Sequence, residues 1–429
     1  HPPQGEGPAA MDTPAGVGGR HTAKPQRTAP MTASTEVRLM TLDPQDPVAL
    51  TQALIRCESV TPAEGGALTL LESVLGAAGF TCHRMTFSEP GTPDVENLYA
   101  RIGTGTPHLC FAGHTDVVPP GDTAAWSVPP FSGEVRGGLL YGRGAVDMKG
   151  GIACFVAAAL RHLAANGGKP AGSISLLITG DEEGPSINGT VKVLDWLKAR
   201  GETLDACIVG EPSNPSALGD EIKIGRRGSL TAEIVVHGRQ GHAAYPQKAD
   251  NPIPKLARIL DRLSSAEIDR GTAHFEPSNL QVTVLSVPNR APNVIPAEAR
   301  ATLNIRYNDT WRRPTIEAWV REQCAAAAAT VGASYDIEFA GTGDVFLTEP
   351  GVLVGTLAAA VAAETGRTPA LTTGGGTSDA RFIKDVCPVV EFGLVNTTIH
   401  AVDEHVPLSD LSRLTAIYQR FLASYFQTN

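Results

Sequence analysis

Short apolar runs alternate with longer helical patterns through the first half of the chain. Runs of strand length occupy residues 109–111, 174–179 and 206–209, and helical patterns cover residues 148–165 and 191–199. Strands that alternate with helices in this way are typical of a parallel sheet covered by helices. An earlier helix is predicted at residues 47–57, because Asp46 suits the N-cap and Pro47 suits the first helical position.

The pattern changes at Gly228. Longer strand-like runs then occupy residues 230–237, 280–287 and 299–307, with helical patterns at residues 254–263 and 315–328. After Gly341 the chain returns to helical and buried-strand patterns, at residues 352–364 and 386–392. We therefore expect an α/β protein in which a separate α+β unit interrupts a domain with a mostly parallel sheet.

These changes predict the domain boundaries. The sheet domain is expected to comprise residues 40–227 and 341–429, and the inserted α+β domain residues 228–340. Residues 1–39 are rich in Pro, Gly, Thr and Ala and have no apolar segment of signal-peptide length, so we expect a disordered leader. A chain of 429 residues is longer than one hydrophobic core usually organises, which agrees with two folded domains.

Composition and charge exclude several classes of protein. The chain is 42% hydrophobic and 19% charged, as in ordinary globular proteins. A net charge of -10 argues against a nucleic-acid partner. The apolar stretch 151–163 is too short to cross a bilayer and contains Arg161 and His162, so no membrane partner is expected. The seven cysteines are scattered, without metal-knuckle or redox spacing, which favours a cytoplasmic location.

Histidines and carboxylates follow several of the predicted strands. The candidates are His114, Asp116, Asp181, Glu182, Glu183, Glu211 and His400 after strands, and Asp147 in a glycine-rich turn that opens a helix. Taken singly, each has a structural explanation as a polar strand end, a solvated acidic turn or a helix cap. The glycines around Asp147 fit neither the dinucleotide-binding nor the P-loop spacing.

Taken together, these side chains predict a metal site. Open α/β sheets bind their ligands at the carboxyl ends of the strands. Two histidines and several carboxylates without cysteine suit zinc or a similar divalent ion in a catalytic site. A carboxylate commonly bridges a two-metal site, and an unliganded carboxylate nearby could act as general base.

The ordered motifs resemble those of the succinyl-diaminopimelate desuccinylases, within the wider family of two-zinc aminoacylases and carboxypeptidases. The resemblance spans roughly residues 40–426. It rests on the segments GHTDVVPPGD (113–122), YGRGAVDMKG (141–150), GDEEG (180–184), GRRGS (225–229), GHAAYP (241–246), NVIP (293–296), GGTSD (375–379) and NTTIH (396–400).

The resemblance implies two zinc ions per subunit, although cobalt or manganese also suits such ligands. One ion would be held by His114, Asp147 and Glu211. The other would be held by Asp147, Glu183 and His400, so that Asp147 is the bridge.

The same resemblance implies roles for two further acidic residues. Glu182 would be the general base of amide hydrolysis, and Asp116 would orient His114. A metal-free binding relative is disfavoured because every implied ligand and the implied base are present.

Further functional residues are implied in and around the inserted domain, which would serve as a dimerisation or lid domain. His242 would reach an active site across a homodimer and stabilise the tetrahedral oxyanion; its structural alternative is a lone surface histidine. The resemblance implies that substrate carboxylates are bound by Arg226, Ser229, Asn293, Arg306 and Thr377, although each arginine could form an ordinary ion pair instead. Pro292 stands where the family often has a second asparagine, which puts the contribution of that loop in doubt.

The implied activity is zinc-dependent hydrolysis of N-succinyl-L,L-2,6-diaminopimelate to succinate and L,L-diaminopimelate, in lysine and cell-wall precursor biosynthesis. The alternative is a deacylase of acetylornithine or a related N-acyl amino acid with the same metal chemistry. The segments 225–229 and 377–379 resemble the succinyl branch more closely.

Overall fold

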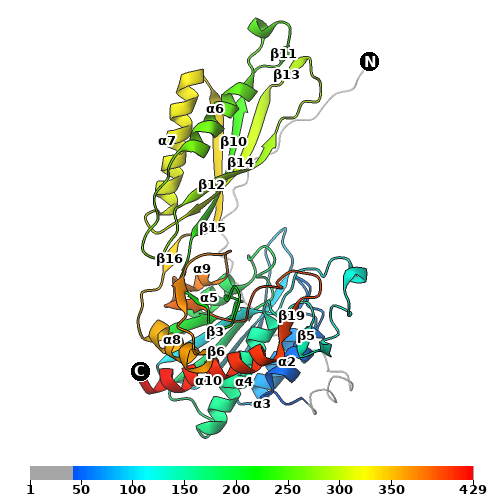
Figure 1. Cartoon of the computed structure of the whole chain (residues 1–429), viewed down its shortest axis with the longest axis vertical. Coiled ribbons are helices and arrows are strands. Elements are labelled where there is room, and N and C mark those ends of the chain that lie inside the picture. Colours follow the sequence, from blue (N-terminus) through cyan, green and yellow to red (C-terminus); the bar gives the residue numbers. More distant parts are fainter. Residues whose placement is uncertain (1–41, 429) are drawn as a thin grey trace, which may run out of the picture. The chain divides into compact units, whose positions relative to one another are not determined.

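The computed structural model describes residues 42–428 of the chain (Figure 1). The predicted leader, residues 1–39, lies outside the described residues. Most of the described chain forms helices and strands around two large sheets, one of eight strands and one of four. Within residues 42–428, no helix is both long enough and apolar enough to cross a membrane.

The larger sheet is parallel at its centre. Its strands are β1 (Thr81–Phe87), β2 (Val95–Ile102), β3 (His108–His114), β6 (Ser173–Thr179), β7 (Ala206–Val209), β8 (Glu221–Lys223), β17 (Ala370–Thr372) and β18 (Val389–Glu391), in the order β1-β2-β6-β3-β7-β18-β8-β17. The pairs β6–β3, β3–β7, β7–β18 and β8–β17 are parallel, and the other three are antiparallel. The carboxyl ends of β3, β6, β7 and β18 therefore lie along one edge of the sheet.

Helices cover both faces of this sheet (Figure 1). The helices are α2 (Pro47–Ile55), α3 (Ala67–Ala77), α4 (Lys149–Ala165), α8 (Val352–Thr365) and α10 (Leu408–Thr428) on one face, and α5 (Thr190–Ala199) and α9 (Ala380–Ile383) on the other. Leu109 and Phe111 of β3 pack with the first group, whereas Cys110 and Ala112 pack with the second. Because both faces are covered, β3 is buried at every position and its residues between the two terminal histidines do not alternate between apolar and polar.

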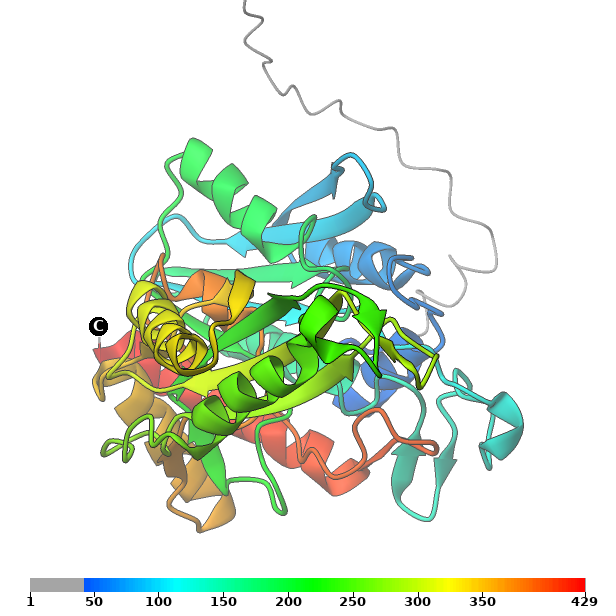
Figure 2. The same cartoon turned by 90° about the horizontal axis from the view of Figure 1, so that it is seen from above.

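The smaller sheet is antiparallel and has its own hydrophobic core. It contains β10 (Gly228–His237), β12 (Asn279–Ser286), β14 (Glu298–Tyr307) and β15 (Ser334–Gly343), in the order β12-β14-β10-β15. Helices α6 (Pro252–Ser265) and α7 (Arg313–Val331) pack side by side on one face (Figure 2). Leu230, Ala232, Ile234 and Val236 of β10 are buried at every second position, as expected for a sheet covered on one face only.

Short strand pairs complete the fold. They are β4 (Val135–Arg136), β5 (Leu139–Tyr141) and β19 (His405–Pro407) in one sheet, β9 (Gly225–Arg226) with β16 (Phe346–Leu347), and β11 (Gly241–His242) with β13 (Val294–Ile295). Pairing of β5 with β19 brings residues near 141 beside residues near 405, which matters for the metal centre described below.

The structure confirms the predicted fold class. The side chain of Asp46 accepts a hydrogen bond from the Val48 amide, as an N-cap does, and α2 ends at Ile55, two residues earlier than predicted. The strand predicted at 386–392 is limited to β18, and Val386 is exposed. The elements α3, β1, β2, β15 and α10 were not predicted from the sequence. The exact boundaries of the inserted domain remain a prediction.

Candidate metal centre

The predicted ligands gather at the carboxyl edge of the larger sheet. His114 is the last residue of β3, Glu182 and Glu183 follow β6, and Glu211 follows β7. Asp147 immediately precedes the residues that open α4, and His400 lies in the turn between β18 and β19. This arrangement follows from parallel pairing, since it aligns the carboxyl ends of strands that are distant in sequence.

Three carboxylates face the buried imidazole of His114. Its Nε2 lies 3.2 Å from Asp147 Oδ1, 3.6 Å from Glu211 Oε1 and 3.8 Å from Glu182 Oε2. On the other side of the ring, Nδ1 lies 2.8 Å from the main-chain oxygen of Asp116. With Nδ1–H donated to that carbonyl, Nε2 presents its lone pair toward the carboxylates, as a metal-binding histidine requires.

A second histidine meets the other oxygen of Asp147. His400 Nε2 lies 3.3 Å from Asp147 Oδ2 and 2.8 Å from Glu183 Oε1. The two carboxylate oxygens of Asp147 therefore face different histidines, which is the arrangement that a carboxylate bridging two cations needs.

The spacing of these atoms fits divalent metal ions. In a tetrahedral zinc site with bonds of about 2.0–2.1 Å, ligand atoms lie about 3.3 Å apart, close to the separations around His114. In two groups of side chains the possible ligand atoms all lie within 4.8 Å of one another, one of His114, Asp147 and Glu183 and one of His114, Glu182 and Glu211. In addition, Glu211 Oε1 is buried and accepts no hydrogen bond from any described residue. The donor set and the unpaired oxygen both favour a cation at this position.

The pKa values of the clustered carboxyl groups also indicate that positive charge is required to keep them ionised together. Burial raises the pKa of Glu182 to about 8, and nearby Asp379, Glu183 and Asp147 add to the rise although His114 opposes it. Burial also raises the pKa of Glu211 well above its usual value. By contrast, the pKa of Asp147 is lowered: burial would raise it, but hydrogen bonds to His114 and His400 outweigh that effect.

The pKa values of the two histidines are also raised. Hydrogen bonds to Asp147 and Glu183 raise the pKa of His400 to about 10. Burial would lower the pKa of His114, but Asp147 and the neighbouring Glu211 raise it well above its ordinary value. Protons thus substitute for cations in holding these like charges together.

Asp116 organises the chain that carries Glu182 and Glu183. Its buried carboxylate accepts hydrogen bonds from the main-chain amides of Glu182 (3.2 Å) and Glu183 (3.0 Å). Its oxygen Oδ1 lies 3.6 Å from His114 Nδ1, farther than the main-chain carbonyl. Asp116 therefore holds both the histidine, chiefly through its backbone, and the following acidic turn, through its side chain.

Glu404 is an important residue that sequence analysis missed. Its carboxylate is fully buried and accepts hydrogen bonds from the amides of Gly144, Val146 and Asp147 and from the Arg143 guanidinium. The amide groups of the glycine-rich turn thus bind an internal anion instead of a phosphate. The short segment Asp403-Glu404 carries no sequence signal of this contact, because the partners of Glu404 lie about 260 residues away.

Four of the five predicted substrate-binding residues lie in or beside β9, β10, β14 and α9. Arg226 is buried and pairs through two nitrogens with Glu391, and its Nη1 also donates to the main-chain oxygen of Gly374 (2.8 Å). Thr377 is exposed in the loop before α9. Ser229 of β10 is directly opposite Arg306 of β14. The Arg226 guanidinium is thus occupied by an ion pair, one of the two alternatives that the sequence left open.

His242 and Asn293 lie together in the β11–β13 hairpin region. His242 pairs with Val294, and the main-chain oxygen of Asn293 accepts a hydrogen bond from the Ala243 amide. The His242 side chain is exposed, and its Nδ1 accepts a hydrogen bond from the Ala244 amide (3.1 Å). The neutral ring therefore carries its proton on Nε2, which is free to donate.

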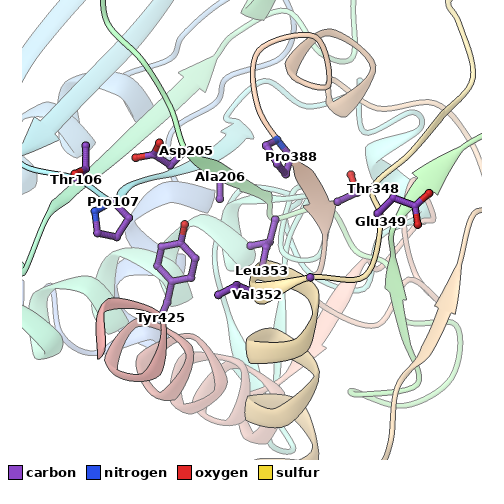
Figure 3. A pocket seen from close by; sticks show the side chains of 11 residues that line it. Thr106, Pro107, Asp205, Ala206, Thr348, Glu349, Val352, Leu353, Pro388 and Tyr425 are labelled. Atoms are coloured by element: carbon purple, nitrogen blue, oxygen red, sulfur yellow. The ribbon is translucent and has the colours of Figure 1, made fainter. Parts of the chain in front are cut away.

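A cavity of about 480 Å³ lies at the opposite edge of the larger sheet (Figure 3). Its wall includes Pro107, Ala206 and Pro388, at the amino ends of β3, β7 and β18, together with Tyr425 of α10. The metal-ligand cluster is at the carboxyl ends of the same strands. The cavity contains none of the predicted site residues and is separate from the candidate centre.

Comparison with known proteins identifies the group to which this arrangement belongs. Residues 110–424 match the family model of the peptidase family M20/M25/M40. A protein of Methylorubrum populi named succinyl-diaminopimelate desuccinylase is 60% identical over 385 residues, covering 90% of this chain and 99% of the relative. A protein of the same name from Methylobacterium nodulans is 62% identical, covering 89% of this chain and 96% of the relative.

Solved structures share the fold at lower sequence identity. The aminopeptidase PepT from Bacillus cereus has a TM-score of 0.72 at 20% identity, covering 90% of this chain and 99% of that one. The YXEP protein from Bacillus subtilis, described as a dinuclear metal-binding peptidase, has a TM-score of 0.64 at 16% identity, covering 92% and 99%. By its sequence and its fold, this chain belongs to the peptidase family M20/M25/M40.

Proposed function

We propose that this chain hydrolyses N-succinyl-L,L-2,6-diaminopimelate to succinate and L,L-diaminopimelate, a step of lysine and cell-wall precursor biosynthesis. The observation that carries the substrate is the identity of about 60%, over nine tenths of the chain, with proteins named succinyl-diaminopimelate desuccinylase. The same relatives favour the succinyl substrate over acetylornithine, the alternative that the metal chemistry alone leaves open.

Two divalent cations, zinc first among them, complete the proposed site. His114, Asp147 and Glu211 would hold one, and Asp147, Glu183 and His400 the other; the opposed oxygens of Asp147 support this assignment. When bound, such ions polarise an amide carbonyl and lower the pKa of water. All five ligands lie at the edge of the sheet where open α/β folds bind substrates.

Glu182 is the proposed general base and acid. Its carboxylate lies beside His114, and its main chain is held by Asp116, so its position is set by the fold rather than by the substrate. It takes a proton from the water that attacks the amide carbon. When the carbon–nitrogen bond breaks, Glu182 passes that proton to the leaving amine, and the acyl group departs as succinate.

His242 is proposed to donate its Nε2 proton to the oxyanion, from the partner subunit of a homodimer. An exposed edge strand supports dimerisation: Val284 and Leu285 of β12 are 52% and 64% exposed, beside apolar residues of α6. Replacement of His242 by alanine should then lower kcat without lowering metal content, and unchanged kinetics of that variant would contradict the role. The cytoplasm is the proposed compartment, since the seven cysteines form no disulfide in the described part of the chain.

The substrate proposal is tested by parallel assays of amine release. Chelator-stripped protein is offered N-succinyl-L,L-diaminopimelate and N-acetylornithine, with and without zinc. We expect zinc-dependent cleavage of the succinyl substrate only. Preference for the acetyl substrate would leave the metal chemistry intact but overturn the proposed substrate, and no cleavage of either would overturn the proposed hydrolysis.

A further inference from the structure

The His400 side chain is held in place more by its turn than by packing. The His400 side chain is 47% exposed, so packing does little to restrain the imidazole. Its backbone has a φ of 57°, in the left-handed region that non-glycine residues seldom adopt, as does Asp403. Besides its contacts with Asp147 and Glu183, this histidine is therefore positioned by the contacts that hold the backbone of the turn.

Arg143 supplies contacts of that kind. Its Nη1 donates to the main-chain oxygen of Ala401 (3.1 Å), and its Nη2 lies 3.4 Å from the main-chain oxygen of His400. The guanidinium is 5.2 Å from the ring centre of Trp126, which restricts it further. Only 2% of Arg143 is exposed, so these contacts are shielded from water.

Glu404 connects the same arginine to the turn that presents Asp147. One carboxylate oxygen accepts from Arg143 Nη1 (2.8 Å) and the Gly144 amide (3.1 Å). The other accepts from the amides of Val146 (2.9 Å) and Asp147 (3.2 Å). The main-chain oxygen of Glu404 also accepts from the Gly142 amide, which continues the pairing of β5 with β19.

We propose that Arg143 and Glu404 form a clamp that positions the second metal site by holding the Asp147 turn and the His400 turn together. They are positioning residues, because neither contributes a proposed ligand atom. Two of the three ligands of that site, Asp147 and His400, are on the clamped turns. Of the ligands at the other site, His114 and Glu211 follow strands β3 and β7 and do not contact the clamp. The inference rests on the proposed two-metal site but not on the identity of the substrate.

Two substitutions test the clamp. Glu404→Gln keeps the side-chain volume but places an NH2 group against amide donors on one side of the carboxylate position. Arg143→Lys keeps the charge but removes the planar fork that reaches both carbonyls and the carboxylate. Glu134→Gln, in the exposed ion pair with Arg136 on the neighbouring strand, is the matched control.

Zinc binding is measured by titration of chelator-stripped protein against a competing chelator, together with metal content per subunit. For both clamp variants we expect one of the two dissociation constants, that of the second site, to rise by about 10–100-fold, the usual effect of removing a partner that positions metal ligands. The other constant should change much less, and the control should match the unsubstituted protein. If Glu404→Gln does not fold, the zinc affinities of Arg143→Lys alone test the proposal.

A double-mutant cycle assigns the effect to the correct site. His400→Ala removes one ligand of the second site, and Arg143→Lys in that background should weaken zinc binding no further. Native affinities in both clamp variants would overturn the proposal, and so would an equal loss at both sites or full additivity with His400→Ala. Because no substrate is used, failure of the clamp is distinguishable from failure of the proposed desuccinylase activity.

Discussion

Without its metal ions, the protein should lose stability as the pH rises from about 5 to 8. Burial raises the pKa of Glu182 to about 8 and that of Asp116 to about 6, and the pKa of Glu211 is also raised. Each carboxyl group is protonated in the folded protein at a pH where the unfolded chain has released the proton. Folding therefore binds protons, so the free energy of unfolding decreases as the pH rises.

Histidine acts in the same direction. The pKa of His400 is raised to about 10 from an ordinary value of 6.5, so its stabilising effect is complete below pH 6.5 and is lost as the pH rises toward 10. Because this side chain is about half exposed, solvent screens its contribution, and it adds less than the buried carboxyl groups. Asp147, whose pKa is lowered, loses its stabilising effect only in strong acid.

The size of the effect follows from Glu182. Between its ordinary pKa of 4.5 and its folded value of about 8, the folded state holds nearly one extra proton. One proton corresponds to about 1.4 kcal/mol of unfolding free energy per pH unit. For a protein of this size, losing that much unfolding free energy lowers Tm by about 2 °C per pH unit.

Thermal and urea unfolding of chelator-stripped protein from pH 5.5 to 8 provides the measurement. Zinc at low micromolar concentration should raise Tm more at pH 8 than at pH 6, because the ligands must lose protons to bind it. Glu182→Gln is the matched variant. In the stripped protein it should make the fall of unfolding free energy with pH less steep, by the contribution of about one proton, which is about 1.4 kcal/mol per pH unit. A stripped protein whose stability is constant or rises over this range would refute the reasoning, as would an unchanged slope in Glu182→Gln.

Three further predictions follow from individual side chains. Glu182→Gln should lower turnover by about 10²–10⁴-fold with metal content unchanged, as measured by steady-state kinetics and elemental analysis; near-normal turnover would exclude Glu182 as the base. Glu391→Ala should cost about 3–5 kcal/mol in urea unfolding, because it leaves the Arg226 guanidinium buried without its carboxylate, and a native midpoint would show that the pair contributes little. Leu285→Asp should convert the proposed dimer to a monomer in size-exclusion chromatography with light scattering, whereas a dimer that survives this change would locate the interface away from β12.

Local patterns predicted much of the fold because local chemistry decides those elements. β3 is buried at every position since both of its faces are covered, and the burial of β10 alternates since only one face is covered. Elements with mixed patterns were missed. β1 is mostly exposed or half-buried, so its seven residues show neither a buried run nor a regular alternation.

The predicted ligands of the candidate centre were recognisable because each belongs to a short motif beside a strand or helix end. The supporting residues were not recognisable in the same way. Glu404 and Glu391 are acidic residues outside the recognised motifs, and their arginine partners are about 260 and 165 positions away. Nothing in their immediate sequence distinguishes a buried structural carboxylate from a solvated one.

The sequence by itself determined the class of the fold, the family resemblance and the identity of the donor atoms, since these depend on residue type and local spacing. Only the tertiary structure decided which atoms meet. Parallel pairing of β3, β6 and β7 aligns ligands that are up to about a hundred residues apart, and the pairing of β5 with β19 brings the Asp147 and His400 turns together. Such contacts depend on strand register and on the burial of charge away from water, and neither can be read from a short stretch of residues.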